Sequence, residues 1–264
     1  YLHHARELSG RGHGLVSPNP MVGFVIVDNN GSIVASGYHE KCGEAHAEIN
    51  ALKEPGSLAK GATAYVTLEP CNHQGKTGPC SQALLDAGIS RVVIGCNDPN
   101  PEAVGGTTFL QSNGIEVVCE HDDGCKKLIA PFLHRLHTGL PWVICKWAQT
   151  ADGYIETPEK EDPWISSQAS QQLVHKERGC VDAIIVGVGT VIADNPSLTV
   201  RIATAHRTPL RVVIDPTLRI PHDATMLDGK VPTLIAHGKD ANKTGFSSNN
   251  VSLFELPVLD DSLD

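Results

Sequence analysis

The sequence feature that most constrains this chain is a histidine and two cysteines that lie in three separate segments yet together offer the ligands of a metal site. His46 stands in Ala45-His46-Ala47-Glu48, and the cysteines stand in Pro70-Cys71 and Pro79-Cys80. Catalytic zinc typically takes three protein ligands and leaves a fourth position for water. One imidazole and two thiolates meet that count. We therefore expect His46, Cys71 and Cys80 to bind Zn²⁺, and the fold to bring their segments together.

Glu48 offers the proton carrier that hydrolysis at such a centre requires. Water bound to zinc loses a proton near neutral pH. Hydrolytic deamination by this zinc hydroxide also needs a group that moves protons to the ring nitrogen and the leaving amine. Glu48 lies two residues from His46 and is not itself a ligand, so we expect it to be the catalytic residue. The order of residues resembles the H-x-E and P-C-x-x-C pattern of nucleobase deaminases.

The first half of the chain alternates apolar, β-rich runs with segments of helical character. A hairpin is expected from two strands around the turn Asn29-Asn30-Gly31, followed by alternating helices and strands. This rhythm predicts a mixed sheet with helices on both faces, an α/β/α arrangement. The expected strands are 21–28, 32–39, 63–68, 91–95 and 115–119, and the expected helices are 3–13, 45–53, 79–87, 106–113 and 124–137.

A boundary is expected at Thr138-Gly139-Leu140-Pro141, which separates a domain of residues 1–140 from a second α/β domain of residues 141–264. In the second domain we expect a helix over 167–178 and strands over 142–149, 183–188, 211–214 and 232–236.

Charge and composition exclude several classes of protein. The formal net charge of −9 gives no general attraction to nucleic acid, and the chain contains no apolar run of 18 residues. Eight unevenly spaced cysteines in 264 residues do not form the disulfide framework of a small secreted domain. We therefore expect a cytoplasmic protein that binds neither nucleic acid nor membrane.

Longer strings around these residues resemble the bifunctional riboflavin-biosynthesis deaminase/reductase family. The resemblance covers nearly the whole chain, and the extended loop between the two cysteines is its most specific part. The strings are Ser17-Pro18-Asn19-Pro20-Met21-Val22-Gly23, Gly37-Tyr38-His39, the segment 67–80 (TLEPCNHQGKTGPC), and in the second half 146–153, 164–167 and 186–201.

The resemblance implies a cytidine-deaminase-like first domain and a dihydrofolate-reductase-like second domain. It implies deamination of 2,5-diamino-6-(5-phosphoribosylamino)pyrimidin-4(3H)-one, followed by NADPH-dependent reduction of the ribosyl group to ribityl. It also implies a homodimer or homotetramer. In the deaminase pocket it assigns the substrate to Asn19, His39, His73 and Lys76. A lysine is a suitable point-charge partner for the substrate's phosphate.

For the reductase the resemblance implies two groups of residues. NADPH would be bound by Gln149, Trp164, Thr190 and Asp194. The substrate would be bound by Arg178, Leu198 and Arg201. The family continues beyond this point with a glycine-rich segment that the sequence up to Asp264 does not match, so we expect this reductase domain to be truncated.

Two other functions fit the residues less well. A deaminase of nucleosides or tRNA is disfavoured by the acidic charge and by the long loop between Cys71 and Cys80. A structural zinc module would normally have a fourth protein ligand, for which His73 is the candidate.

Overall fold

The computed structural model divides the chain into two compact units. Unit 1 is Tyr1–Cys145 and unit 2 is Lys146–Asp264. The structure describes residues 1–53, 56–73, 78–101, 103–155, 165–246, 249–259 and 262–263.

Unit 1 is built around one five-stranded sheet with the strand order β2-β1-β3-β4-β5. Strand β1 lies between β2 and β3 and runs antiparallel to both, whereas β3, β4 and β5 are parallel. The strands are β1 (Gly23–Val27), β2 (Ile33–Tyr38), β3 (Thr63–Val66), β4 (Arg91–Ile94) and β5 (Glu116–Cys119). The helices are α1 (Leu2–Ser9), α2 (Ala47–Ala51), α3 (Cys80–Asp86), α4 (Gly106–Ser112) and α5 (Asp123–Thr138), with short 3-10 turns at Gly10–Gly12 and Gly56–Ala59.

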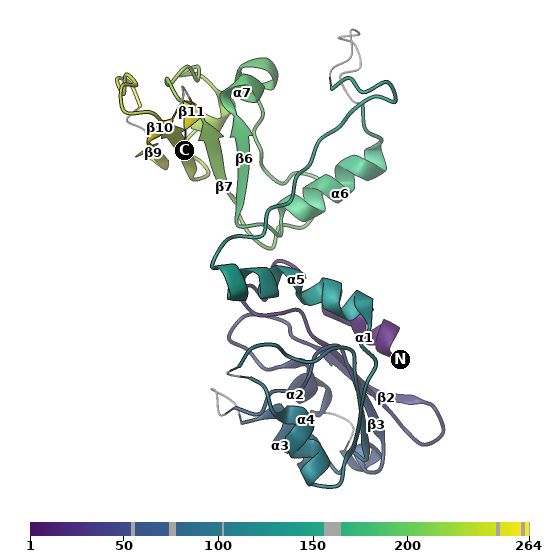
Figure 1. The fold of residues 1–264 in the computed structure, drawn as a ribbon. Coiled ribbons are helices and arrows are strands. Elements are labelled where there is room, and N and C mark those ends of the chain that lie inside the picture. Colours follow the sequence, from purple (N-terminus) through teal and green to yellow (C-terminus); the bar gives the residue numbers. More distant parts are fainter. Residues whose placement is uncertain are drawn as a thin grey trace. The chain divides into compact units, whose positions relative to one another are not determined.

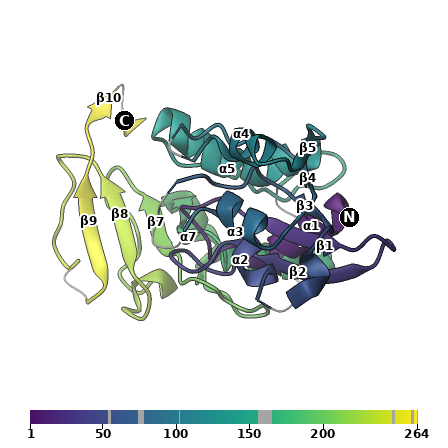
Figure 2. The ribbon, with the colours of Figure 1, turned by 90° about the horizontal axis from the view of Figure 1, so that it is seen from below.

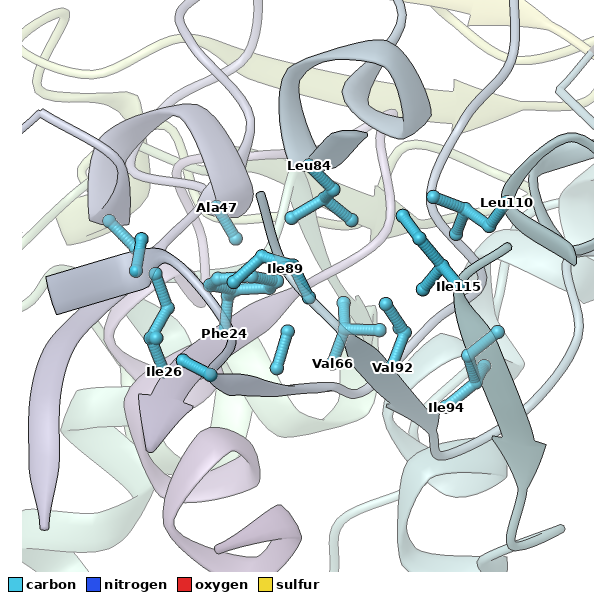
Figure 3. Close-up of a cluster of buried hydrophobic side chains, with 14 residues drawn as sticks. Phe24, Ile26, Ala47, Val66, Leu84, Ile89, Val92, Ile94, Leu110 and Ile115 are labelled. Carbon is cyan, nitrogen blue, oxygen red and sulfur yellow. The ribbon is translucent and has the colours of Figure 1, made fainter. Parts of the chain in front are cut away.

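Helices cover both faces of this sheet (Figure 1). Successive side chains of a strand point to opposite faces, and β1 uses both. Phe24 and Ile26 join the larger core, which α2, α3 and α4 cover (Figure 3). Val25 and Val27 pack instead against Ala5 of α1. Because β1 is apolar on both faces, it lies in the middle of a three-layer unit.

The turn between β1 and β2 shows why the hairpin forms at the expected place. Gly31 has a φ of 81°, which glycine adopts without strain. Asp28 Oδ1 accepts hydrogen bonds from the backbone N–H groups of Asn30 at 2.9 Å and Ser32 at 2.8 Å.

Unit 2 contains a four-stranded parallel sheet in the order β6-β7-β8-β9. Figure 2 shows β7, β8 and β9 side by side. Its core gathers side chains of β7, β8 and α7 around Met226. The strands are β6 (Ala183–Gly187), β7 (Leu210–Ile214), β8 (Thr233–His237), β9 (Val251–Glu255), β10 (Val258–Leu259) and β11 (Ser262–Leu263), and the helices are α6 (Gln168–Arg178), α7 (Val188–Asp194) and a 3-10 turn at Thr225–Leu227.

The structure confirms the α/β fold class and nearly all the expected elements, with ends that shift by a few residues. The strand expected over 142–149 is wrong, because these residues form neither helix nor strand and nearly all of them are exposed. A strand requires a hydrogen-bonding neighbour, and among the described residues none pairs with this segment. In the described part of the chain, no helix is both long and apolar enough to cross a membrane.

Candidate active sites

His46, Cys71 and Cys80 meet at one point of unit 1. Their ligand atoms all lie within 4.8 Å of one another. His46 Nδ1 lies 3.6 Å from Cys71 Sγ and 3.3 Å from Cys80 Sγ. The fold brings them together because His46 precedes α2, Cys71 follows β3 and Cys80 begins α3. The site thus lies where the loop after β3 meets the N-terminal ends of α2 and α3.

The spacing of these atoms fits a tetrahedral zinc ion. Zinc bonds of about 2.3 Å to sulfur and about 2.0 Å to nitrogen, at tetrahedral angles, place a sulfur and a nitrogen ligand about 3.5 Å apart. The two distances found, 3.6 and 3.3 Å, bracket that value. Two thiolates and an imidazole are also ligands that zinc prefers.

The pKa values of the two thiols, Cys71 and Cys80, are shifted in opposite directions. A hydrogen bond from the Cys80 thiol lowers the pKa of Cys71 to about 4, and the His46 imidazole acts in the same direction. The same hydrogen bond and burial raise the pKa of Cys80. The backbone N–H of Cys80 also points to Cys71 Sγ, 3.5 Å away. The Cys71 thiol therefore loses its proton more readily than the Cys80 thiol, and a bound divalent cation would favour the thiolate form of both.

Glu48 lies in the first turn of α2, beside the three ligand residues. Its side chain is only 3% exposed. Burial raises the pKa of Glu48, while the neighbouring charge of His46 acts in the opposite direction. The His46 backbone is extended and the helix begins at the next residue, so both side chains reach the same site.

Asn19 and His39 form a pair next to the cluster. Asn19 Nδ2 lies 3.3 Å from His39 Nε2, and His39 Nδ1 lies 3.0 Å from the carbonyl oxygen of Ala45. A carbonyl oxygen only accepts, so Nδ1 carries the proton and Nε2 accepts from the Asn19 amide. The His39 ring also stands edge-on to His46, with ring centroids 5.6 Å apart. Burial lowers the pKa of His39, which favours the neutral ring that this pairing needs.

The other two expected pocket residues lie in the loop between the cysteines. His73 is exposed, two residues after Cys71. Its charge acts on the carboxyl group of Asp98, whose pKa is raised mainly by burial. Lys76 lies outside the described residues.

The sequence analysis did not single out Glu69, which lies two residues before Cys71 in the loop that carries this proposed zinc ligand. This carboxylate is 6% exposed and accepts hydrogen bonds from two backbone N–H groups, those of Asp98 and Thr107. The sequence did contain a signal for this role, because Glu69 stands between Leu68 and Pro70 at the end of an apolar strand. A charged side chain that is buried there needs hydrogen-bond partners.

In unit 2 the three expected substrate residues lie around one loop. Arg178 of α6 donates to the carbonyl oxygen of Thr199 at 3.0 Å. The backbone N–H of Arg201 donates to His175 Nδ1 at 3.1 Å. Burial and the neighbouring charge of Arg201 lower the pKa of Arg178. Leu198, buried in the same loop, has a φ of 50°. The charge of Arg201 therefore acts on Arg178, and an anion such as phosphate would relieve this repulsion.

The expected cofactor residues are more scattered. Thr190 and Asp194 are exposed on α7, one helical turn apart. Gln149 is exposed in a segment without helix or strand, where it accepts a hydrogen bond from Trp147 Nε1 at 3.2 Å. The described residues show no hydrogen bond between Gln149 and α7. Trp164 lies outside the described residues.

Two protein families match consecutive parts of the chain. Residues 1–96 match the cytidine and deoxycytidylate deaminase zinc-binding region, and residues 141–261 match the RibD C-terminal domain.

Curated relatives align with most of the chain. The riboflavin biosynthesis protein RibD of Bacillus amyloliquefaciens is 46% identical over 248 residues, which are 92% of this chain and 67% of the relative. That of Aquifex aeolicus is 42% identical over 248 residues, which are 92% of this chain and 69% of the relative. The chain thus spans about two thirds of the length of these relatives.

Solved structures show the same similarity in three dimensions. Acinetobacter baumannii RibD, form 1, superposes with a TM-score of 0.77 at 37% identity and covers 98% of this chain and 74% of its own. The diaminohydroxyphosphoribosylaminopyrimidine deaminase/5-amino-6-(5-phosphoribosylamino)uracil reductase of Thermotoga maritima gives a TM-score of 0.79 at 32% identity, covering 97% of this chain and 79% of its own.

Proposed function

The chain belongs to the RibD family of bifunctional riboflavin-biosynthesis deaminase/reductases, and on this premise we propose which of its residues perform each reaction. For the deaminase, His46, Cys71 and Cys80 hold Zn²⁺. The observation that carries this assignment is the meeting of three ligand atoms within 4.8 Å of one another, from three segments.

Glu48 is the proton carrier of the deamination. When bound, zinc lowers the pKa of water and so supplies the nucleophile near neutral pH. The reaction replaces the ring's amino group by an oxygen, and one water is consumed for each ammonia released. Glu48 takes one proton from the attacking water and passes it to the ring nitrogen. It then carries the second proton, from the new hydroxyl group, to the amine, which leaves as ammonia. Its burial beside the ligands keeps the carboxyl group away from bulk water.

The substrate is 2,5-diamino-6-(5-phosphoribosylamino)pyrimidin-4(3H)-one, held by Asn19, His39, His73 and Lys76. The pairing of Asn19 with His39 supports this assignment. Because one N–H of the amide donates to His39, the other N–H and the carbonyl oxygen remain for a pyrimidine edge. Lys76 meets the phosphate, since it lies in the polar loop between the two cysteine ligands.

Unit 2 performs the reduction with NADPH. Arg178 and Arg201 bind the substrate's phosphate, and Leu198 packs beside its ribosyl chain. Gln149, Trp164, Thr190 and Asp194 contact the cofactor, which supplies the hydride. The repulsion between the two arginines supports the phosphate assignment.

The compartment and the assembly are also proposals. All eight cysteines are free thiols, which suits the reducing cytoplasm. A homodimer or homotetramer is proposed, and size-exclusion chromatography with light scattering measures it directly.

A direct comparison of substrates tests the proposed deaminase. Ammonia release is measured with the phosphoribosylaminopyrimidine, with cytidine and with tRNA, together with the zinc content of the same protein. We expect turnover of the phosphoribosylaminopyrimidine alone and one zinc per chain. Turnover of only cytidine or tRNA would favour a deaminase of nucleosides or tRNA. Zinc with no turnover of any substrate, and with His73 as a fourth ligand, would favour a structural module.

A further inference from the structure

A buried carboxylate next to the proposed zinc site has no role in the reaction described above. Glu69 stands two residues before Cys71 and is 6% exposed. Its Oε1 accepts a hydrogen bond from the backbone N–H of Thr107 at 2.9 Å, and its Oε2 accepts one from the backbone N–H of Asp98 at 3.3 Å. Both carboxylate oxygens are therefore used, and each binds a different part of the chain.

These two partners belong to the segment that runs from the end of β4 to the start of α4. Asp98 lies a few residues after β4, and Thr107 lies in the first turn of α4. The backbone adds a second set of ties, because the N–H of Glu69 donates to the carbonyl of Cys96 at 2.9 Å. The N–H of Asn72 donates to the carbonyl of Ala103 at 3.3 Å. The described residues of this stretch, 97–101 and 103–107, thus lie along the loop 69–72 that carries Cys71, and they are called segment 97–107 below.

The same segment forms part of the wall of the metal centre. Ala103 packs in one buried cluster with Cys71 and Cys80, and Ile49 of α2 packs against it. The fit is close, since a Cβ at Gly106 would lie 1.9 Å from the carbonyl oxygen of Pro70. A shift of segment 97–107 therefore moves the surface against which both cysteine side chains rest.

We propose that Glu69 is a positioning residue that fixes the Cys71 loop relative to segment 97–107. The affinity for zinc and the shape of the substrate pocket both depend on this arrangement. The proposal rests on the proposed deaminase function for its substrate part only. A carboxylate suits this place because it offers two acceptors to two N–H groups, whereas an amide of the same shape offers only one oxygen. Residues that orient metal ligands from behind typically change metal affinity or activity by about 10- to 100-fold when altered.

The test compares Glu69→Gln and Glu69→Ala with Thr67→Val in the full chain. Thr67 is a matched control, because it is fully buried, lies at the same end of β3, and accepts a backbone N–H through its side chain. Its partner is Gly23 of β1, at 3.1 Å, and not segment 97–107. Zinc affinity is measured by competition with a chromogenic chelator, and kcat and KM for ammonia release are measured with the phosphoribosylaminopyrimidine. Thermal unfolding of each zinc-free variant is recorded alongside.

We expect Glu69→Gln to bind zinc about 10-fold or more weakly and to raise KM. Thr67→Val is expected to lower thermal stability but to keep the zinc affinity within about twofold. Equal zinc affinity and equal KM in Glu69→Gln and the unsubstituted chain would overturn the proposal. So would an equal loss of zinc affinity in Thr67→Val, since that would mark a general effect of stability. Where Glu69→Ala does not fold, Glu69→Gln decides the question. The zinc measurement needs no substrate, so its result stands even where the proposed substrate is not turned over.

Discussion

Cys80 Sγ lies 3.3 Å from His46 Nδ1, although 34 positions separate the two residues in the sequence. The contact joins the start of α3 to the residue that precedes α2. Both helices pack on the same core, so the distance between these ligand atoms is set by the packing of the sheet and its helices. Substitutions near His46, Cys71 and Cys80 can therefore be divided into two kinds. Some remove a group that takes part in the reaction, and others alter the packing that positions the ligands.

Replacing Glu48 by glutamine should remove the proton carrier and leave the ligands in place. The amide has the same shape but cannot accept the proton, so we expect deamination to fall by about 10²- to 10⁴-fold with unchanged zinc content. Ammonia release and metal analysis of the same sample measure this. Glu116→Gln, at the exposed first residue of β5, is the control. Unchanged turnover in Glu48→Gln would remove this residue from the mechanism.

Replacing Lys76 by alanine should distinguish substrates that carry a phosphate from those that do not. Loss of a hydrogen bond to a charged group costs about 1.5–3 kcal/mol, so we expect KM for the phosphorylated substrate to rise by about 10-fold or more. The dephosphorylated analogue should change little. Lys53→Ala, at the end of α2, serves as the control. An equal loss with both substrates would mean that Lys76 contacts another part of the molecule.

A methyl group at Gly106 should push α4 away from the metal loop. The added Cβ would lie 1.9 Å from the carbonyl oxygen of Pro70, so backbone must move. We expect Gly106→Ala to lower the free energy of unfolding by about 1–3 kcal/mol and to weaken zinc binding as well. Gly10→Ala is the matched control, because no atom lies within 4 Å of its added Cβ. Denaturant unfolding and the chelator assay measure the two effects, and equal stability of both variants would contradict the prediction.

Arg211 is the largest fully buried side chain of the described residues, and its guanidinium group bonds to several segments of unit 2. It donates to the carbonyls of Ser197 and Val231, at 3.3 and 2.7 Å, and to Asp228 at 3.2 Å. Arg211→Met fills similar volume but removes these hydrogen bonds, so we expect the free energy of unfolding to fall by about 2–3 kcal/mol. Hydrogen exchange of the β7 and β8 amides measures this loss within unit 2. The control is the exposed Arg219→Met, and equal exchange in both variants would be the contrary result.

The buried His175 should make the stability of unit 2 depend on pH. Burial, and then the charges of Arg178 and Arg201, lower its pKa from the ordinary 6.5. As the pH falls below that value, the unfolded chain gains a proton before the folded chain does. The free energy of unfolding is therefore expected to fall as the pH drops from about 6.5 toward the lower folded pKa.

His175→Gln removes this titration and supplies a side-chain oxygen that can accept from the Arg201 N–H. Hydrogen exchange of the β6 and β7 amides is measured from about pH 7 to about pH 5, corrected for the intrinsic rate. We expect a shallower pH dependence of unit 2 stability in the variant. The same slope in both proteins would show that another group titrates.

Much of the fold follows from patterns within single segments. The β1–β2 hairpin could be predicted because Asn29-Asn30-Gly31 separates two apolar runs, and Gly31 has the positive φ that such a turn requires. The end of α5 at Thr138 follows similarly, since Gly139 takes the left-handed conformation after it. The segment 142–149 has the composition of a strand but lies unpaired, because a strand also depends on a neighbour elsewhere in the chain.

By itself, the sequence predicted the chemistry that we propose for this protein. The ligand types, the carboxylate at Glu48 and the order of the two domains depend on residue identity and local spacing, which the sequence contains directly. The tertiary structure decided which groups are withdrawn from water and which backbone atoms they meet. It buried Glu69 against segment 97–107 and Arg211 against the loop at Ser197. Those contacts arise from the packing of distant segments, and no periodicity within one segment encodes them.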